Sequence, residues 1–228
     1  MAVLVAWELL ARSGWLLRDV VPTLAVTADA IVRLATTQDF YTNLGVTARE
    51  VGASLAIGGT AGLAIGLALG GNRYLSQAFE AMVVWLGPMP KIIFFPAMIM
   101  WFGVGSGSKI AMGAMSCFFP IAINTAAAMR EIDGVLIRVG RAFRASRPQM
   151  VIKIYLPAMR ASIVNGIRLG LGVAIIGTLL AETKLSNRGL GYLVIQAYAL
   201  FDMPRLYALL IALFVLSIGV NALISRLK

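Results

Sequence analysis

Long apolar segments recur along the chain, and most are long enough to cross a lipid bilayer. The clearest covers 22 residues without a charge, between Glu50 and Arg73. At about 1.5 Å per residue, a helix of this length matches a hydrocarbon core of about 30 Å. The pattern predicts an all-α polytopic membrane protein in which one transmembrane domain occupies residues 1–228. We expect six spans, at about residues 1–12, 51–72, 78–102, 109–129, 161–181 and 206–225.

Three of these spans depart from a plain apolar helix. The first is short and carries Glu8, so we expect it to be abbreviated. The third contains Pro88 and Pro90, which interrupt helical hydrogen bonding and predict a kink. The fifth is apolar except for Arg168, whose long side chain can reach the membrane surface from about two turns inside.

Glycines follow one face of the second span at intervals of four residues. These are Gly58, Gly62, Gly66 and Gly70. Hydrogen side chains in such a row let another helix approach closely, which is a main source of helix association in lipid. We favour packing within one chain over a contact between subunits, although small residues serve both.

Composition and charge confirm a membrane setting and exclude several classes of enzyme. Hydrophobic residues make up 60% of the chain and charged residues 13%, against about 45 to 50% and 25% in soluble domains. With no histidine and one cysteine, the chain cannot build a zinc site, a Cys-His dyad or a Ser-His-Asp triad. It also lacks the G-x-x-x-x-G-K-[ST] phosphate loop. We therefore expect no catalytic activity and no bound cofactor or metal in this chain.

Basic residues are concentrated between the fourth and fifth predicted spans. The loop at 130–160 holds seven of the twenty in the chain: Arg130, Arg138, Arg141, Arg144, Arg147, Lys153 and Arg160. Cytoplasmic loops carry such an excess, so the loop is predicted inside, and alternation along the spans then places both termini in the cytoplasm. Arginines at every third residue beside apolar positions form a surface suited to a partner protein or to lipid head groups.

A resemblance becomes specific in this loop. Arg138 to Gly172 resembles the EAA loop of bacterial ABC importer permeases, whose pattern is E-A-A, three residues, G, nine residues and I-x-L-P. Ile154, Leu156 and Pro157 match in register. Arg138, Val139 and Gly140 replace E-A-A, and Arg144 stands at the glycine position.

Other segments extend this resemblance to the nitrate, sulfonate, taurine and bicarbonate branch of the binding-protein-dependent transport family. They are Pro88-Met89-Pro90, Phe95-Pro96-Ala97, Trp101 to Gly105, Cys117 to Ile121, Ala181-Glu182 and Gly189 to Tyr192. The likeness covers about Val3 to Ile224.

The resemblance implies a type I ABC importer permease of the bacterial inner membrane, with a cytoplasmic coupling helix in the 130–160 segment, here named the coupling loop. It further implies a homodimer, two cytoplasmic ATPase subunits that use ATP and Mg, and an extracytoplasmic solute-binding protein. The residues expected to contact the ATPase are Arg138, Gly140, Arg141, Ala142, Phe143, Arg144, Ala145, Ser146, Ile154, Leu156 and Pro157.

Five polar residues in or near the spans are candidates for the translocation pathway: Lys91, Asn124, Asn165, Arg168 and Glu182. Each has a structural alternative. The two cations would reach the membrane surface, or, for Arg168, pair with loop carbonyls or Glu131. The asparagines would hydrogen-bond between helices, and Glu182 would be a solvated helix end.

Together these features predict a permease subunit that moves a small anionic solute, such as nitrate, a sulfonate, taurine, bicarbonate or another small organic acid, into the cytoplasm by alternating access. The alternative is a membrane scaffold that does not transport and whose basic loop binds a soluble partner or anionic lipid. Isolation together with an ATPase would distinguish the two.

Overall fold

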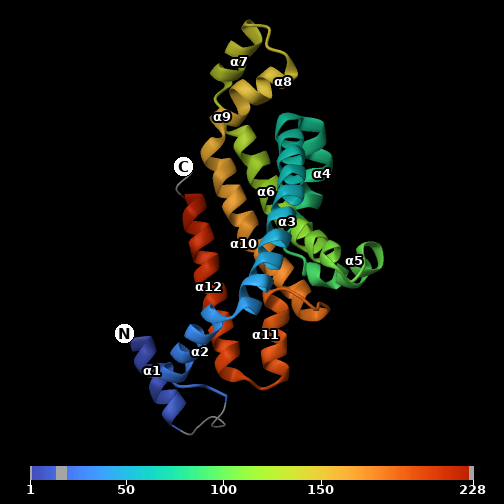
Figure 1. Ribbon diagram of the computed structural model, residues 1–228. Coiled ribbons are helices and arrows are strands. Elements are labelled where there is room, and N and C mark those ends of the chain that lie inside the picture. The colour runs from blue at the N-terminus through green and yellow to red at the C-terminus, as the bar shows by residue number, and fades with distance from the viewer. Residues whose placement is uncertain (1, 14–19, 226–228) are drawn as a thin grey trace. The chain divides into compact units, whose positions relative to one another are not determined.

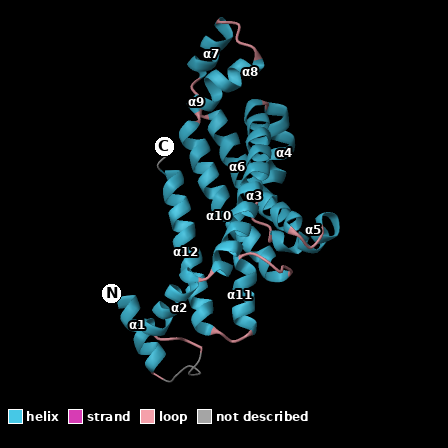
Figure 2. Ribbon diagram, in the orientation of Figure 1, coloured by secondary structure: helices cyan, strands magenta, loops and turns pink. Residues whose placement is uncertain are grey.

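The computed structural model describes residues 2–13 and 20–225, and every regular element among them is helical (Figures 1 and 2). The α-helices are α1 (Ala2–Arg12), α2 (Leu24–Thr36), α3 (Gln38–Gly71), α4 (Arg73–Leu86), α5 (Phe95–Phe102), α6 (Ser106–Arg130), α7 (Gly134–Ala142), α8 (Arg147–Met150), α9 (Leu156–Ala158), α10 (Arg160–Lys184), α11 (Leu190–Ala199) and α12 (Met203–Ser225). A 3₁₀ turn, η1 (Lys91–Phe94), precedes α5, and a π-helical segment, η2 (Val151–Tyr155), follows α8.

Four of the described helices, α3, α6, α10 and α12, are long and apolar enough to cross a membrane, and α4 with η1–α5 makes a fifth if the bent pair is one span. The span predicted at residues 1–12 is not among them. Its helix, α1, has 11 residues, which reach only about 16 Å. Four of the six predicted spans thus have a counterpart among the described residues, and the third has one if α4 and η1–α5 form a single span. The chain ends were predicted to be cytoplasmic, but Met1 and residues 226–228 lie outside the described residues.

The residues pack into two compact units. Unit 1 comprises Met1–Arg49 and Leu179–Gly219, and unit 2 comprises Glu50–Thr178 and Val220–Lys228. The core of unit 1 is a cluster of buried apolar side chains from α2, α3, α11 and α12. Its members are Leu34, Phe40, Leu190, Leu193, Ala197, Ala208 and Leu209.

In unit 2, the predicted glycine row of α3 lies directly on α6. A Cβ atom built on Gly58 would fall 2.2 Å from the Ala114 carbonyl oxygen, and one on Gly66 would fall 2.5 Å from Thr125 Cβ. Gly62 and Gly70 meet α6 in the same way. Packing within one chain, the favoured prediction, is therefore what the row does, because only hydrogen side chains leave room for α6 at this distance.

The predicted kink in the third span is a sharp break. The axes of α4 and the η1–α5 segment differ by 93°, and residues 87–90, Gly-Pro-Met-Pro, separate them. Neither proline can donate a backbone hydrogen bond, so the helix cannot continue through them.

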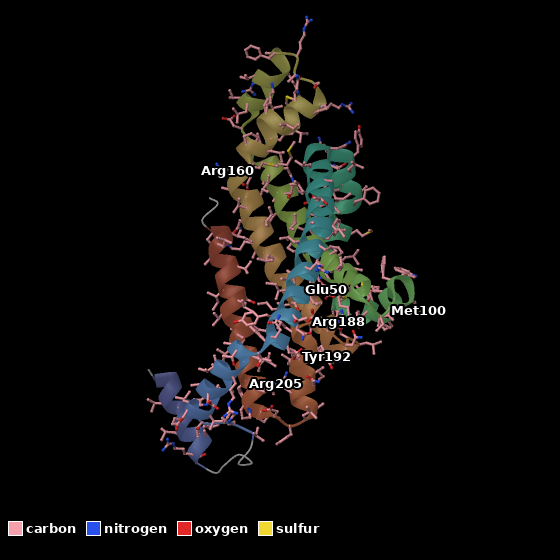
Figure 3. The ribbon with its side chains drawn as sticks, viewed as in Figure 1. Glu50, Met100, Arg160, Arg188, Tyr192 and Arg205 are labelled. Atoms are coloured by element: carbon pink, nitrogen blue, oxygen red, sulfur yellow. The ribbon has the colours of Figure 1, made fainter. Side chains whose placement is uncertain are left out.

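Figure 3 shows Met100 on α5, and its side chain is 85% exposed in this chain.

Candidate functional site

The coupling loop begins with a short amphipathic helix. Asp133 caps α7 by accepting a hydrogen bond from the Val135 amide at 2.8 Å. On the inner face of α7, Gly140 is buried, and a Cβ there would fall 2.3 Å from Ile154 Cδ1 and 2.5 Å from Met150 Sδ. Gly140 occupies the last position of the E-A-A triplet, so the structure gives a packing reason for a small residue at this point. Figure 1 shows α7 and α8 at one end of α6 and α10, within unit 2.

The turn after α7 is the one that the sequence pattern put in question, because Arg144 replaces the expected glycine. Arg144 has φ 51°, in the left-handed region. Its amide donates to the Arg141 carbonyl at 2.9 Å, and the Ala145 amide donates to the Gly140 carbonyl at 3.0 Å. This pair of bonds defines a Schellman motif with Arg144 at the position where glycine is usual. The turn forms without glycine, at a conformational cost of about 1 kcal/mol.

The second half of the loop starts from a capping box. Ser146 Oγ accepts from the Gln149 amide, and the Gln149 side chain accepts from the Ser146 amide at 2.8 Å. The chain then widens into η2, where the Leu156 amide reaches back to the Val151 carbonyl. Pro157, which has no amide hydrogen, follows at once in α9. The matched Ile-x-Leu-Pro residues therefore span the junction of η2 and α9.

Apolar side chains lie exposed on the loop among its arginines. Phe143 is 83% exposed, and Val135, Leu136 and Val139 are each exposed by nearly half. Large exposed apolar groups that cluster beside charges commonly mark a protein contact. All eleven residues predicted to contact the ATPase lie in the segment from α7 to α9, and their role stays a prediction.

A polar row that sequence reasoning missed lies on α3. Asn43, Thr47, Glu50 and Ser54 recur at intervals of four, three and four residues, and each is at most 6% exposed. Figure 3 labels Glu50 on this helix. The row continues in register into Gly58, so the buried side of α3 changes from polar to glycine. The helical spacing of four polar residues upstream of the apolar run was the available signal; reading the span only from Val51 hid it.

In unit 1, two members of this row bind the segment around α11. The Asn43 side chain accepts from the Gly189 amide at 2.7 Å, and Thr47 Oγ1 accepts from the Leu190 amide at 2.8 Å. Thr47 in turn donates to Glu182 Oε1 at 2.7 Å, and the Gly191 amide donates to Glu182 Oε2 at 2.6 Å. Glu182 is fully buried, so its description as a solvated helix end was wrong.

Gly189 shows why the residue beside this carboxylate is glycine. Its φ is 104°, and a Cβ there would fall 2.4 Å from the Glu182 carboxylate. The carboxylate lies at the N-terminus of α11, where free amides and the helix dipole favour negative charge. The geometry makes Glu182 a structural cap of α11, whereas its predicted pathway role stays a prediction.

The remaining pathway candidates have separate surroundings in unit 2. Lys91 Nζ donates to the carbonyls of Gly87 and Met89 at the helix break and lies 5.1 Å from the centre of the Phe119 ring. Asn124 donates to the Pro120 carbonyl of its own helix at 2.8 Å, so the predicted bond between helices is not the one observed.

The surroundings of Arg168 and Asn165 also differ from those predicted. Arg168 Nη2 donates to Ser225 Oγ near the end of α12, in place of the expected loop carbonyls or Glu131. Its Nε is buried and has no hydrogen-bond partner among the described residues. Asn165 is exposed on α10.

Three helices of unit 2, α3, α6 and α10, meet where the hydroxyl groups of Ser54 and Thr178 lie against Gly113. A Cβ on Gly113 of α6 would fall 2.4 Å from both Ser54 Oγ of α3 and Thr178 Oγ1 of α10. Ser54 donates to the Ile110 carbonyl at 3.0 Å. Lys109, at the start of α6, is 1% exposed and donates to the Val104 carbonyl. Thr178 gave no sequence signal of its own, since a Thr hydroxyl in a helix can bond to a carbonyl of the same helix. Here its Oγ1 is buried and has no hydrogen-bond partner among the described residues.

Long apolar helices joined by a capped, cationic loop are those of a multi-pass membrane protein, and comparison with known proteins identifies which kind. Residues 58–228 match the family of binding-protein-dependent transport system inner membrane components. The chain belongs to this family. It is therefore a multi-pass inner membrane protein, the non-catalytic permease subunit of an ABC importer that works with an ATPase and a binding protein.

Individual relatives carry different names. A permease of Bacillus subtilis named for aliphatic sulfonates transport, SsuC, is 29% identical over 91% of this chain and 75% of its own length. The taurine transport system permease TauC of Escherichia coli is 31% identical over 73% of this chain and 62% of its own. The formylaminopyrimidine transport permease ThiX of Halalkalibacterium halodurans is 27% identical over 99% of this chain and 90% of its own length.

A solved structure supports the fold. An inward-facing conformation of the MetNI methionine ABC transporter aligns with a TM-score of 0.60 and 23% identity, over 80% of this chain and 96% of the other. The predicted type I importer permease fold is confirmed by this likeness.

Proposed function

We propose that this permease carries a small sulfonate, or a similarly small organic anion, into the cytoplasm as a homodimer, and that an ATPase binds its coupling loop. The observation that carries the solute class is the identity of 29% and 31% to permeases named for aliphatic sulfonates and taurine. A sulfonate is a fixed anion, and the pathway candidates include two cations, Lys91 and Arg168.

Uptake into cells that express the complete transporter tests the solute. Labelled taurine should accumulate, and excess alkanesulfonate should compete with it. Formylaminopyrimidine, which the name of a third relative suggests, is the comparison compound. Competition by formylaminopyrimidine alone, without any by sulfonates, would overturn the proposed solute class while leaving the family membership intact.

The two cations are distinguished by their partners. Lys91 already donates to two carbonyls at the helix break, whereas Arg168 keeps a buried Nε without a partner in the described part of the chain. We expect Arg168→Gln to lower kcat/KM for uptake about tenfold, which corresponds to about 1.4 kcal/mol. The matched Lys91→Gln variant should change uptake less than twofold. Equal losses in both would contradict a specific contact between Arg168 and the solute.

The ATPase contact rests on the exposed ring of Phe143 among arginines. Aromatic residues at the centre of an interface commonly contribute 2 kcal/mol or more, so Phe143→Ala should weaken co-purification of the ATPase about thirtyfold. Phe102→Ala is the control, because Phe102 is 56% exposed and lies outside the loop, on α5. Unchanged co-purification of the Phe143 variant would count against this surface.

Cysteine labelling can test on which side of the membrane the coupling loop lies. The single native cysteine, Cys117, is fully buried and should not react. In Ala142→Cys, an impermeant maleimide should react only after cells are opened, because the loop is proposed to be cytoplasmic. Gln38→Cys, at the exposed start of α3, should react in intact cells. The reverse pattern would invert the proposed topology.

A further inference from the structure

A groove of about 680 Å³ lies under the coupling loop, within unit 2. The loop forms one wall, and the neighbouring ends of α3, α4 and α6 form the other. The residues that line it are Leu67, Ala68, Gly71, Asn72, Leu75, Met129, Arg141, Ala145, Arg147, Met150, Val151 and Tyr155.

The lining divides into a cationic part and an apolar part. Arg141 of α7 and Arg147 of α8 supply two guanidinium groups, and neither forms an ion pair with another described residue. No carboxylate is among the described residues that line the groove. Leu67, Leu75 and Met129 supply the apolar part. A ligand that satisfies both parts must be an anion with an apolar extension.

Further donors lie beside the two arginines. Asn72 uses its side-chain oxygen to cap α4, accepting from the Tyr74 amide at 2.9 Å. Its amide hydrogens remain available to donate, and the positive end of the α4 dipole points to the same place. Tyr155 adds a hydroxyl group at the groove wall. These groups favour an anion with several acceptor oxygens, such as a phosphate.

The position of the groove along the helices fits a lipid better than a free anion. The uncharged stretch of α3 ends at Gly71, and α6 ends at Arg130, so we infer from the sequence pattern that the groove lies near the surface of the membrane. Phosphate groups of lipids lie at this depth, and Leu67 lies about one turn deeper along α3. A lipid would thus place its phosphate by the arginines and an acyl chain along the apolar wall.

We propose that this groove is a binding site for one anionic phospholipid, with the headgroup phosphate held by Arg141 and Arg147. Arginine forks bind phosphate oxygens in pairs, which a zwitterionic lipid engages less well because its own cation faces the same groups. The site does not depend on the transported solute, so it goes beyond the proposed function. It shares Arg141 and Ala145 with the predicted ATPase contact, so lipid binding is measured on the chain without the ATPase, where loss of the lipid and loss of the ATPase are separate results.

Native mass spectrometry of the detergent-purified chain tests the site, with phosphatidylglycerol and phosphatidylcholine of identical acyl chains as probes. We expect one phosphatidylglycerol to bind at least tenfold more tightly than phosphatidylcholine. Arg141→Gln and Arg147→Gln should each weaken phosphatidylglycerol binding about fivefold, since a cation near anionic lipid contributes about 1 kcal/mol.

The loop provides its own matched controls. Arg138 and Arg144 belong to the same run of arginines but do not line the groove. Arg138→Gln and Arg144→Gln should therefore change the affinity less than twofold. Equal losses in all four variants would show diffuse attraction to a basic loop and would overturn the site.

A second pair of measurements separates a lipid from a phosphate group alone. Leu75→Gln should weaken phosphatidylglycerol binding without loss of helix content, because Leu75 lines the groove and is 37% exposed. Glycerol phosphate at the same concentration should not displace the lipid. Full displacement by glycerol phosphate, or an unchanged affinity in the Leu75 variant, would overturn the role of the apolar wall.

Discussion

Two sides of α3 carry glycine, and they have opposite surroundings. On one side Gly58, Gly62 and Gly66 are buried against α6, with neighbouring atoms 2.2 to 2.7 Å from where a Cβ would stand. On the other side a Cβ on Gly52 would meet no atom within 4 Å, and one on Gly59 would meet Ile121 Cδ1 at an ordinary 3.5 Å.

The open side is nevertheless shaped. Gly52, Ala56, Gly59 and Thr60 line an apolar groove of about 360 Å³, closed at its edges by Ile121 and by Ile163 and Ile167 of α10. Small residues thus allow a helix contact on one side of α3 and form an apolar groove on the other. Glycine spacing therefore predicts close approach only where a partner helix is present.

The largest effect is expected for Gly66→Val. Its side chain would collide with the Ala122 carbonyl oxygen and with Thr125, both held on the α6 backbone or close to it. Because these backbone atoms cannot move away, the overpacking should lower the free energy of unfolding by more than about 3 kcal/mol. Folded yield in detergent and unfolding by titrated denaturing detergent measure it. Gly52→Val is the control, and a comparable loss in both variants would remove the distinction between the two sides.

A smaller loss is expected for Gly58→Ala. One methyl group would stand 2.2 Å from the Ala114 carbonyl oxygen and 2.5 Å from Cys117 Sγ, so α3 and α6 must separate slightly. The cost should be about 1 to 3 kcal/mol in the same unfolding titration. Gly58→Ser, with its larger side chain, should be at least as damaging; an unchanged midpoint for either variant would show that the helices adjust freely here.

Arg144→Gly extends the comparison to a place where glycine is absent although the backbone suits it. Removing the left-handed strain at φ 51° should stabilise the loop by up to about 1 kcal/mol. Slower proteolysis between α7 and α8, or slower amide exchange at Ala145, would report it. Arg138→Gly is the control, since it lies inside α7 and should destabilise by about 1 kcal/mol. Faster exchange in the Arg144 variant would argue that the arginine side chain itself holds the turn.

The smallest effect is expected for Gly59→Ala. The added methyl group makes an ordinary contact with Ile121 and restricts the unfolded chain, so unfolding should be unchanged or shifted by about 0.5 kcal/mol in favour of the folded state. Gly59 lines the open apolar groove of α3. If a second copy of the chain occupies this groove, Gly59→Ala should still fold but should change the oligomeric state. Loss of stability in the monomer would contradict an open surface at this position.

Local patterns in the sequence predicted the spanning helices well. Uncharged runs gave α6, α10 and α12 to within a few residues at each end, because apolar length is set by the bilayer itself. The same rule placed the start of α3 too late, at Val51 in place of Gln38, since Arg49 and Glu50 were taken to end the apolar run. Glu50 is 3% exposed, so a charged residue here belongs to the packed part of the helix.

The side-chain partners within the candidate site were not predictable in this way. Glu182, Arg168 and Asn124 were each singled out correctly as unusual, yet the atoms that they contact differ from those expected. A polar residue in an apolar span signals that some partner exists, but the partner is chosen by tertiary packing, which periodicity does not record. The turn at Arg144 is the converse case, where a residue contrary to the motif left the backbone geometry unchanged.

The hydrogen bonds that Asn43 and Thr47 make to the start of α11 join residues 146 and 143 positions apart in the chain. As the polypeptide leaves the ribosome and enters the bilayer, α3 can settle on α6 once residue 130 has emerged. The two polar side chains of α3 must then remain without these partners until Gly189 and Leu190 are synthesised. In the order of translation, the glycine contact can therefore form first, whereas the bonds around Glu182 can be completed only near the end.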